Sequence, residues 1–157
     1  MNIKPNFIEV QNAYEKYTIC KNIIEKLPKW FGIPQSNNEY CEGVKEYLFY
    51  KIIVSNDVIG FVSIKFNYET IAEIYVMGIL CEYHRRGIGT YIIKHITSKL
   101  KKMGIKYLEV KTLDESRESG EYKQTRLFYK KVGFIPIDVL KNEWGKDNPC
   151  LIMIKKL

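Results

Sequence analysis

The chain has 157 residues, of which 46% are hydrophobic and 27% are charged. These fractions are ordinary for a globular protein and exclude an intrinsically disordered chain. The length suits one domain, so we expect a single domain over residues 1–157. No apolar run approaches the roughly 18–20 residues of a membrane span, and the first residues lack the hydrophobic core of a signal peptide. We therefore expect a cytoplasmic protein without a membrane partner.

The formal net charge of +7 by itself suggests a polyanionic partner. The kinds of basic residue that produce this charge favour a narrower interpretation. Only four of the 25 basic residues are arginines, namely Arg85, Arg86, Arg117 and Arg126. Arginine is the better bidentate phosphate ligand, so the adjacent pair Arg85-Arg86 is a sharper signal than the scattered lysines. No continuous basic stripe and no aromatic RNA-binding motif occurs, which disfavours a nucleic-acid-binding domain.

The cysteines and histidines predict no metal site. The four cysteines, Cys20, Cys41, Cys81 and Cys150, are widely spaced and contain no CxxC pair. Neither a zinc signature nor a disulfide framework follows from that pattern, so we expect reduced and mostly buried thiols. The two histidines, His84 and His95, are too isolated to build a metal site.

The first third of the chain predicts a short extended segment and two helices. The extended segment covers Ile3–Val10, and apolar residues then recur at helical spacing up to Leu27. Pro28 and the following loop close this helix. A short second helix is expected over Asn38–Glu46.

Three strands are expected next. The runs Tyr47–Ser55 and Val58–Phe66 predict an antiparallel hairpin that turns at Asn56-Asp57, and Ile71–Leu80 is a third β-branched and aromatic run. A glycine-rich turn and a helix follow, and Gly104 is expected to cap that helix.

The last third predicts a strand, a helix and two terminal strands. We place them at Ile105–Thr112, Lys123–Val132, Phe134–Leu140 and Cys150–Lys156, with Gly133 ending the helix. A hairpin followed by alternating helices and strands predicts an α/β fold with a mixed sheet.

The segment Ile79–Thr90 (ILCEYHRRGIGT) carries the strongest site signal, because a strand runs into a glycine-rich turn that opens a helix. Free N–H groups of a first helical turn, together with Arg85 and Arg86, suit a pyrophosphate. A plain glycine turn with solvated arginines remains the alternative. The P-loop pattern is absent, and a dinucleotide-binding motif would need a third glycine where Ile92 stands.

Two motifs resemble those of the GNAT superfamily of N-acetyltransferases. His84–Gly89 (HRRGIG) resembles the family's motif A, and Phe128–Phe134 (FYKKVGF) resembles its motif B. The resemblance implies a mostly antiparallel GNAT-like sheet flanked by helices. Two positions depart from the family pattern: His84 stands where Gln or Arg is usual, and Tyr122 stands where many members carry Asn.

The resemblance also implies a binding site for acetyl-CoA as co-substrate. Its pyrophosphate would lie on the glycine loop and its pantetheine arm along the preceding strand. The residues implied are Met77, Gly78, Ile79, Leu80, His84, Arg85, Arg86, Gly87, Ile88, Gly89 and Thr90.

Two residues are the expected catalytic groups. Tyr129 matches the motif B tyrosine that commonly serves as general acid toward the leaving thiolate, although a core aromatic is the alternative. Glu73 lies 14 residues before Gly87, which is the spacing of the catalytic glutamate in the histone-acetylating branch of the family. A general base is needed because an alkylamine with a pKa near ~10.4 is protonated at neutral pH. An outward-facing structural glutamate is the alternative.

The acceptor is expected to be a primary amine of a small molecule or a peptide. Trp30, Phe31, Tyr75 and Trp144 are the candidate substrate-binding residues, since aromatic walls suit an amine with apolar or cationic groups. A non-catalytic acyl-CoA-binding module is the alternative function. The protein is expected to be a monomer or a homodimer.

Overall fold

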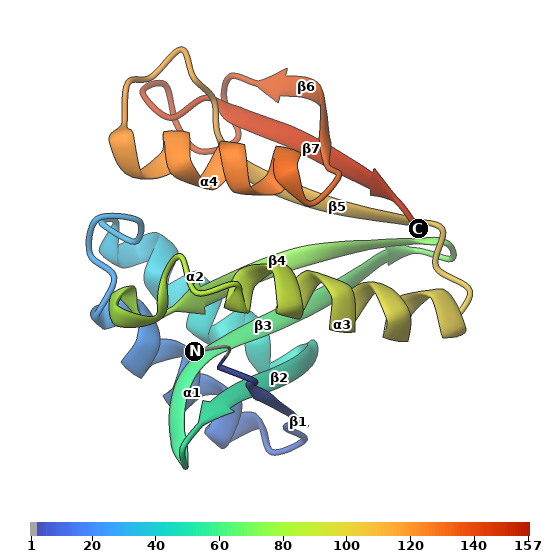
Figure 1. Ribbon diagram of the computed structural model, residues 1–157. Helices are drawn as coiled ribbons and strands as arrows, with labels where there is room; N and C mark the ends of the chain where they lie inside the picture. The colour runs from blue at the N-terminus through green and yellow to red at the C-terminus, as the bar shows by residue number, and fades with distance from the viewer. Residues whose placement is uncertain (1–2) are drawn as a thin grey trace. The chain divides into compact units, whose positions relative to one another are not determined.

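The computed structural model describes residues 3–157 and shows seven strands and four α-helices in that part of the chain (Figure 1). The strands follow the order β1-β2-β3-β4-β5-β7-β6 in one sheet, and the pairs β1–β2, β2–β3, β5–β7 and β6–β7 are antiparallel. This confirms the predicted α/β fold with a mostly antiparallel sheet. The elements are β1 (Asn6–Glu9), α1 (Ala13–Glu25), α2 (Pro34–Gly43), β2 (Leu48–Val54), β3 (Asp57–Tyr68), β4 (Ile71–Ile79), α3 (Ile88–Lys102), β5 (Tyr107–Leu113), α4 (Gly120–Lys131), β6 (Ile135–Leu140) and β7 (Cys150–Lys156), with short 3-10 helices at Val44–Glu46 and Cys81–Tyr83.

The chain divides into two compact units. The first contains the residues up to Phe66 together with Ile74–His95, and the second contains Asn67–Glu73 together with Ile96–Leu157. Among residues 3–157, no helix combines the length and apolar character that crossing a bilayer requires.

In the first unit, α1 covers one face of the strands. Asn12 begins the helix, because its Oδ1 accepts the backbone N–H of Glu15 at 2.8 Å. The buried stripe of α1 includes Ile23, which belongs to the same apolar cluster as Phe49 and Phe61. The rings of Phe49 and Phe61 stack on each other with centroids 5.2 Å apart.

The other face of these strands carries α3. Phe7 of β1 stacks on His95 of α3 with ring centroids 4.3 Å apart, and Tyr50 of β2 meets the same imidazole edge-on at 5.5 Å. Successive side chains of a strand point to opposite faces, so Phe49 packs with α1 while Tyr50 packs with α3. Because both faces are covered, the run 59–64 of β3 is buried at every position.

The hairpin between β2 and β3 is confirmed, but its turn lies one residue earlier than predicted. Ser55 and Asn56 occupy the turn with φ of 50° and 74°, and Val54 pairs with Asp57. A two-residue loop with two positive φ values is the type I′ turn whose twist matches the flanking strands. Asp57 therefore starts β3 instead of ending the turn.

In the second unit, β5 and β7 pair without interruption from Tyr107↔Lys156 to Leu113↔Cys150. The edge strand β6 has an irregularity next to Pro136, and an edge is where a residue without an N–H is tolerated. Helix α4 runs alongside these strands (Figure 1).

Two helices begin earlier than the sequence pattern predicted. The second helix starts at Pro34 and not at Asn38, because proline is well suited to the first helical turn, and the predicted stretch ends in the 3-10 turn Val44–Glu46. Helix α4 starts at Gly120 and not at Lys123, since Ser119 Oγ accepts the N–H of Tyr122 at 3.3 Å and caps it. The predicted glycine ends of α3 and α4 are confirmed, with φ of 86° at Gly104 and 100° at Gly133.

Candidate functional site

The loop before α3 is shaped to receive an anion. Arg85 and Gly87 adopt positive φ values of 58° and 78°, which turn the chain sharply into the helix. The N–H of Tyr91 donates to the carbonyl of Gly87 at 3.0 Å. The N–H groups of residues 88–90 precede this bond and have no acceptor within the helix. Together with the positive end of the helix dipole, they form an anion-binding helix start.

The charges around this loop have the matching sign. Arg85 and Arg86 are both exposed, and the Arg86 guanidinium lies 5.8 Å from the centre of the Tyr83 ring. The first turn of α3 contains no acidic residue. A Cβ added to Gly87 would have no atom within 4 Å, so the space beside the loop is open. These features fit a diphosphate group.

His84 is tied to the end of β4. Its Nε2 lies 2.6 Å from the carbonyl oxygen of Ile79, and its ring meets Trp30 edge-on with centroids 5.4 Å apart. The imidazole thus anchors the loop to the strand that precedes it. A contact of His84 with phosphate stays a prediction.

Gly78 is required for packing inside the first unit. A Cβ at this position would lie 2.9 Å from Ile23 Cγ2 and 3.3 Å from Leu27 Cδ1, both on the α1 side. The resemblance implied that Gly78 lies beside a pantetheine arm, and its close contact with α1 is a separate reason for a glycine at this position. The pairing of the Met77–Leu80 backbone with a pantetheine arm stays a prediction.

Tyr129 is fixed on α4 in the second unit. It is 6% exposed, and its ring lies 5.3 Å from the rings of both Phe128 and Phe134, measured between centroids. One turn earlier, Arg126 is also buried and donates from Nη1 to the carbonyl of Leu113 at 2.7 Å. This bond attaches α4 to the end of β5 and so limits how far the tyrosine can move.

Glu73 lies in the same unit, near the start of β4, and is 6% exposed. Its Oε1 accepts a hydrogen bond from Asn67 Nδ2 at 2.8 Å. Lys111 of β5 is electrostatically coupled to this carboxylate. A buried, partnered carboxylate is different from the outward-facing glutamate that the sequence left as the alternative.

The candidate acceptor residues are partly brought together. Tyr40 links two of them, since its ring centroid is 6.0 Å from that of Phe31 and 5.6 Å from that of Tyr75. Tyr47 continues this row of rings at 4.8 Å from Tyr75. Trp30 contacts His84, and Trp144 lies in the second unit, where its carbonyl accepts from Asn148 Nδ2 at 3.4 Å.

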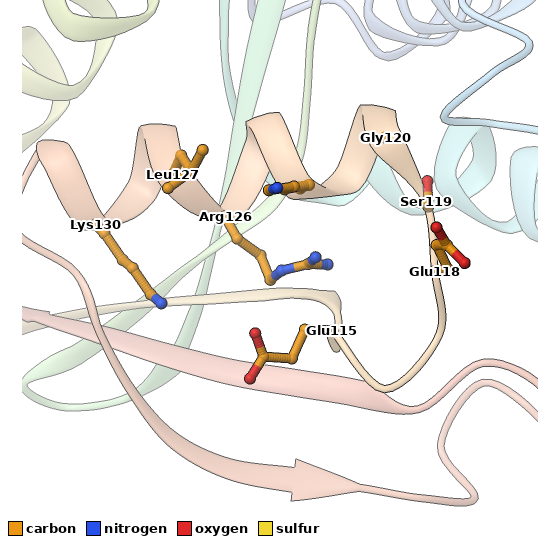
Figure 2. Close-up of a pocket in the computed structure, with 8 residues that line it drawn as sticks. Glu115, Glu118, Ser119, Gly120, Arg126, Leu127 and Lys130 are labelled. Carbon is orange, nitrogen blue, oxygen red and sulfur yellow. The ribbon is translucent and has the colours of Figure 1, made fainter.

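A polar cavity of about 380 Å³ lies beside α4 (Figure 2). Arg126 and Lys130 extend from the helix toward Glu115 on the facing loop, while Glu118 and Ser119 lie at the helix start. The lining residues are Glu115, Glu118, Ser119, Gly120, Lys123, Arg126, Leu127 and Lys130. None of the sequence-predicted site residues is among them. Across residues 3–157, no group of histidine, cysteine or carboxylate side chains could hold a metal ion.

The profile of the acetyltransferase (GNAT) family matches residues 10–134, which include the glycine loop with motif A and the whole of motif B. The chain belongs to the acetyltransferase (GNAT) family. A relative from Haemophilus influenzae, [ribosomal protein bS18]-alanine N-acetyltransferase, is 30% identical over 120 residues, which is 76% of this chain and 73% of the relative.

Solved GNAT structures share the fold. The ribosomal-protein-S18-alanine N-acetyltransferase from Escherichia coli is similar with a TM-score of 0.77 at 15% identity, over 98% of this chain and 94% of that one. A GNAT acetyltransferase from Elizabethkingia anophelis, solved with acetyl-CoA bound, has a TM-score of 0.71 at 17% identity over 99% of both chains.

Sequence reasoning missed two residues that accompany Glu73. Asn67 donates a hydrogen bond to its carboxylate, and Lys111 supplies a nearby positive charge. Lys111 and Asn67 are ordinary polar residues in strand patterns, and only strand pairing reveals their neighbours.

Proposed function

We propose that this GNAT protein is an acetyl-CoA-dependent N-acetyltransferase that acts on a primary amine of a small molecule or a peptide. The observation that supports this most directly is the open loop at the start of α3, which joins the N–H groups of a first helical turn to two exposed arginines. Its charge and shape fit the pyrophosphate of CoA. Family membership and the acetyl-CoA-bound relative support the same co-substrate.

In the proposed reaction an N–C bond forms as the C–S bond of the thioester breaks. An alkylammonium with a pKa near ~10.4 must first lose a proton, which Glu73 accepts directly or through a water molecule. Tyr129 supplies the proton that the leaving thiolate needs, because a phenol is protonated at neutral pH. The burial of Tyr129 and its position in motif B support this role.

A peptide N-terminus is the first acceptor to test. The Haemophilus influenzae relative carries a name that specifies alanine of a ribosomal protein. The aromatic row from Phe31 to Tyr75, with Trp30 in the same unit, would then provide apolar contacts for side chains that follow the reacting amine.

The deciding experiment combines binding and turnover. Thermal unfolding is measured with CoA and with acetyl-CoA, and a panel containing an alanine-terminated peptide, a lysine peptide, spermidine and kanamycin is then assayed for acetyl-CoA-dependent acetylation by mass spectrometry. Stabilisation by CoA with acetylation of at least one amine is expected. Stabilisation without turnover would favour the non-catalytic acyl-CoA-binding module, and the absence of both would overturn the proposal.

A further inference from the structure

Glu73 is a buried carboxylate that has a hydrogen-bond donor and a positive charge as neighbours. Only 6% of the residue is exposed, and a carboxylate removed from water is unfavourable unless polar groups or opposite charges compensate it. Asn67, at the end of β3, provides one hydrogen bond, with 2.8 Å between its Nδ2 and Glu73 Oε1. The bond engages one carboxylate oxygen and leaves Oε2 outside it.

Lys111 provides the opposite charge. Burial lowers the pKa of this lysine, and the negative charges of Glu73, Glu143 and Glu109 more than offset that effect, so the pKa is raised above its ordinary value. Its Nζ also lies 3.6 Å from Glu143 Oε1. The ammonium is therefore charged at neutral pH and belongs to a small network within the second unit.

The two partners are suited to different tasks. Asn67 is exposed and lies six residues before Glu73, on the strand that precedes β4, so it can orient the carboxylate without forming part of the core. Lys111 is half-buried and acts on Glu73 through its charge. A directed hydrogen bond fixes geometry, whereas a neighbouring charge mainly stabilises the ionised form.

We propose that Asn67 and Lys111 are positioning residues for Glu73, with Asn67 holding Oε1 so that Oε2 accepts the proton of the amine, and Lys111, on the neighbouring strand β5, acting as a counter-charge beside the carboxylate. This rests on the proposed function of Glu73 as the base. Neither residue touches the reacting atoms in this scheme. Each acts only through the glutamate.

The test measures kcat and the KM for acetyl-CoA with the most rapidly acetylated amine of the panel. Asn67→Ala is expected to lower kcat about tenfold, less than the ~10²–10⁴-fold effect of a general base itself because the glutamate is still present, and Lys111→Met to lower it by several fold. The KM for acetyl-CoA is expected to stay unchanged in both. Lys111→Arg keeps the charge and is expected to restore most of the activity. Matched controls at exposed positions of helices, Asn22→Ala and Lys101→Met, are expected to behave as the unmodified protein.

A double-mutant comparison distinguishes positioning from a general structural effect. In a Glu73→Gln background, Asn67→Ala and Lys111→Met are expected to cost no further activity, since the group they act through is already gone. Full additivity would overturn the proposal, as would a normal kcat in Asn67→Ala. If Glu73→Gln alone is slow while Asn67→Ala is normal, the positioning role fails and the base role stands. If Glu73→Gln is fully active, the base assignment fails and the positioning role fails with it.

Discussion

Gly78 of β4 faces Ile23 of α1 so closely that a Cβ on the glycine would come within 2.9 Å of the isoleucine Cγ2. Leu27 Cδ1 and Phe61 Cε1 would each be 3.3 Å away, so the added Cβ would meet close neighbours on several sides. This contact explains why a central strand contains a glycine, a residue that ordinarily weakens strands.

Gly78→Ala is therefore expected to destabilise the fold by about 1–3 kcal/mol, the range for overpacking a filled core. The midpoint of chemical denaturation, with the slope unchanged, measures it. Gly120→Ala is the matched control, because its added Cβ meets no atom within 4 Å. Equal stability of the two variants would contradict the packing role of Gly78.

Gly87→Ala is expected to weaken CoA binding by about tenfold or more. A Cβ at a φ of 78° strains the loop and displaces the N–H groups that would face the pyrophosphate. Gly104→Ala is a close control, since Gly104 has a φ of 86° and the same open surroundings but ends α3 instead of starting it. Isothermal titration with CoA is expected to separate them, and a similar loss of affinity in both variants would remove the loop from the binding site.

Tyr129→Phe is expected to reduce kcat by about 10²-fold or more while the affinity for acetyl-CoA changes little, because only the proton donor is lost. Single-turnover kinetics with acetyl-CoA and the best amine measures the chemical step directly. Tyr14→Phe, at a tyrosine that is 76% exposed, serves as the control. An unchanged rate in Tyr129→Phe would overturn its role as the proton donor.

The four thiols are expected to differ in reactivity. Cys81 is exposed, whereas Cys20, Cys41 and Cys150 are buried, and burial raises the pKa of Cys150 to about 11. The sulfurs of Cys20 and Cys41 face each other at 3.7 Å inside the first unit. At pH 8 one equivalent of an aromatic disulfide reagent is expected to react promptly, and all four thiols after denaturation. Cys81→Ser should abolish the prompt reaction; three or more fast thiols in the native protein would contradict the buried positions.

Asp114 is expected to make the folding stability of the protein depend on pH in the acidic range. Hydrogen bonds from Ser116 and the charge of Arg126 lower the pKa of this carboxyl. A depressed pKa in the folded state stabilises the protein above the unfolded pKa of ~3.9, and this contribution is lost as the pH falls through the folded value. Asp114→Asn is therefore expected to be less stable at pH 7, by at most about 1 kcal/mol because solvent screens this carboxylate, with a gap that narrows below about pH 4. Melting temperatures across that range measure it, with exposed Asp147→Asn as control; a gap that widens in acid would refute the assignment.

The sequence by itself determined the order of the elements and the glycine loop. Hydrophobic periodicity and turn residues are local signals, so the hairpin, the strands and the glycine ends of α3 and α4 could be predicted. Boundaries set by single caps were less accurate, as Pro34 and Ser119 show. Motifs A and B also lie within short stretches of chain, which is why the family could be predicted from the sequence alone.

Only the tertiary structure decided what surrounds those residues. The partners of Glu73 come from β3 and β5, and their meeting depends on strand pairing that no local pattern encodes. The need for a glycine at position 78 is seen only when α1 is packed against β4. The anchoring role of His84 is seen only when its ring lies against the carbonyl of Ile79. Spacing along the chain sets which residues can bear a function, whereas contacts between distant segments set the charge, burial and orientation that each of them has.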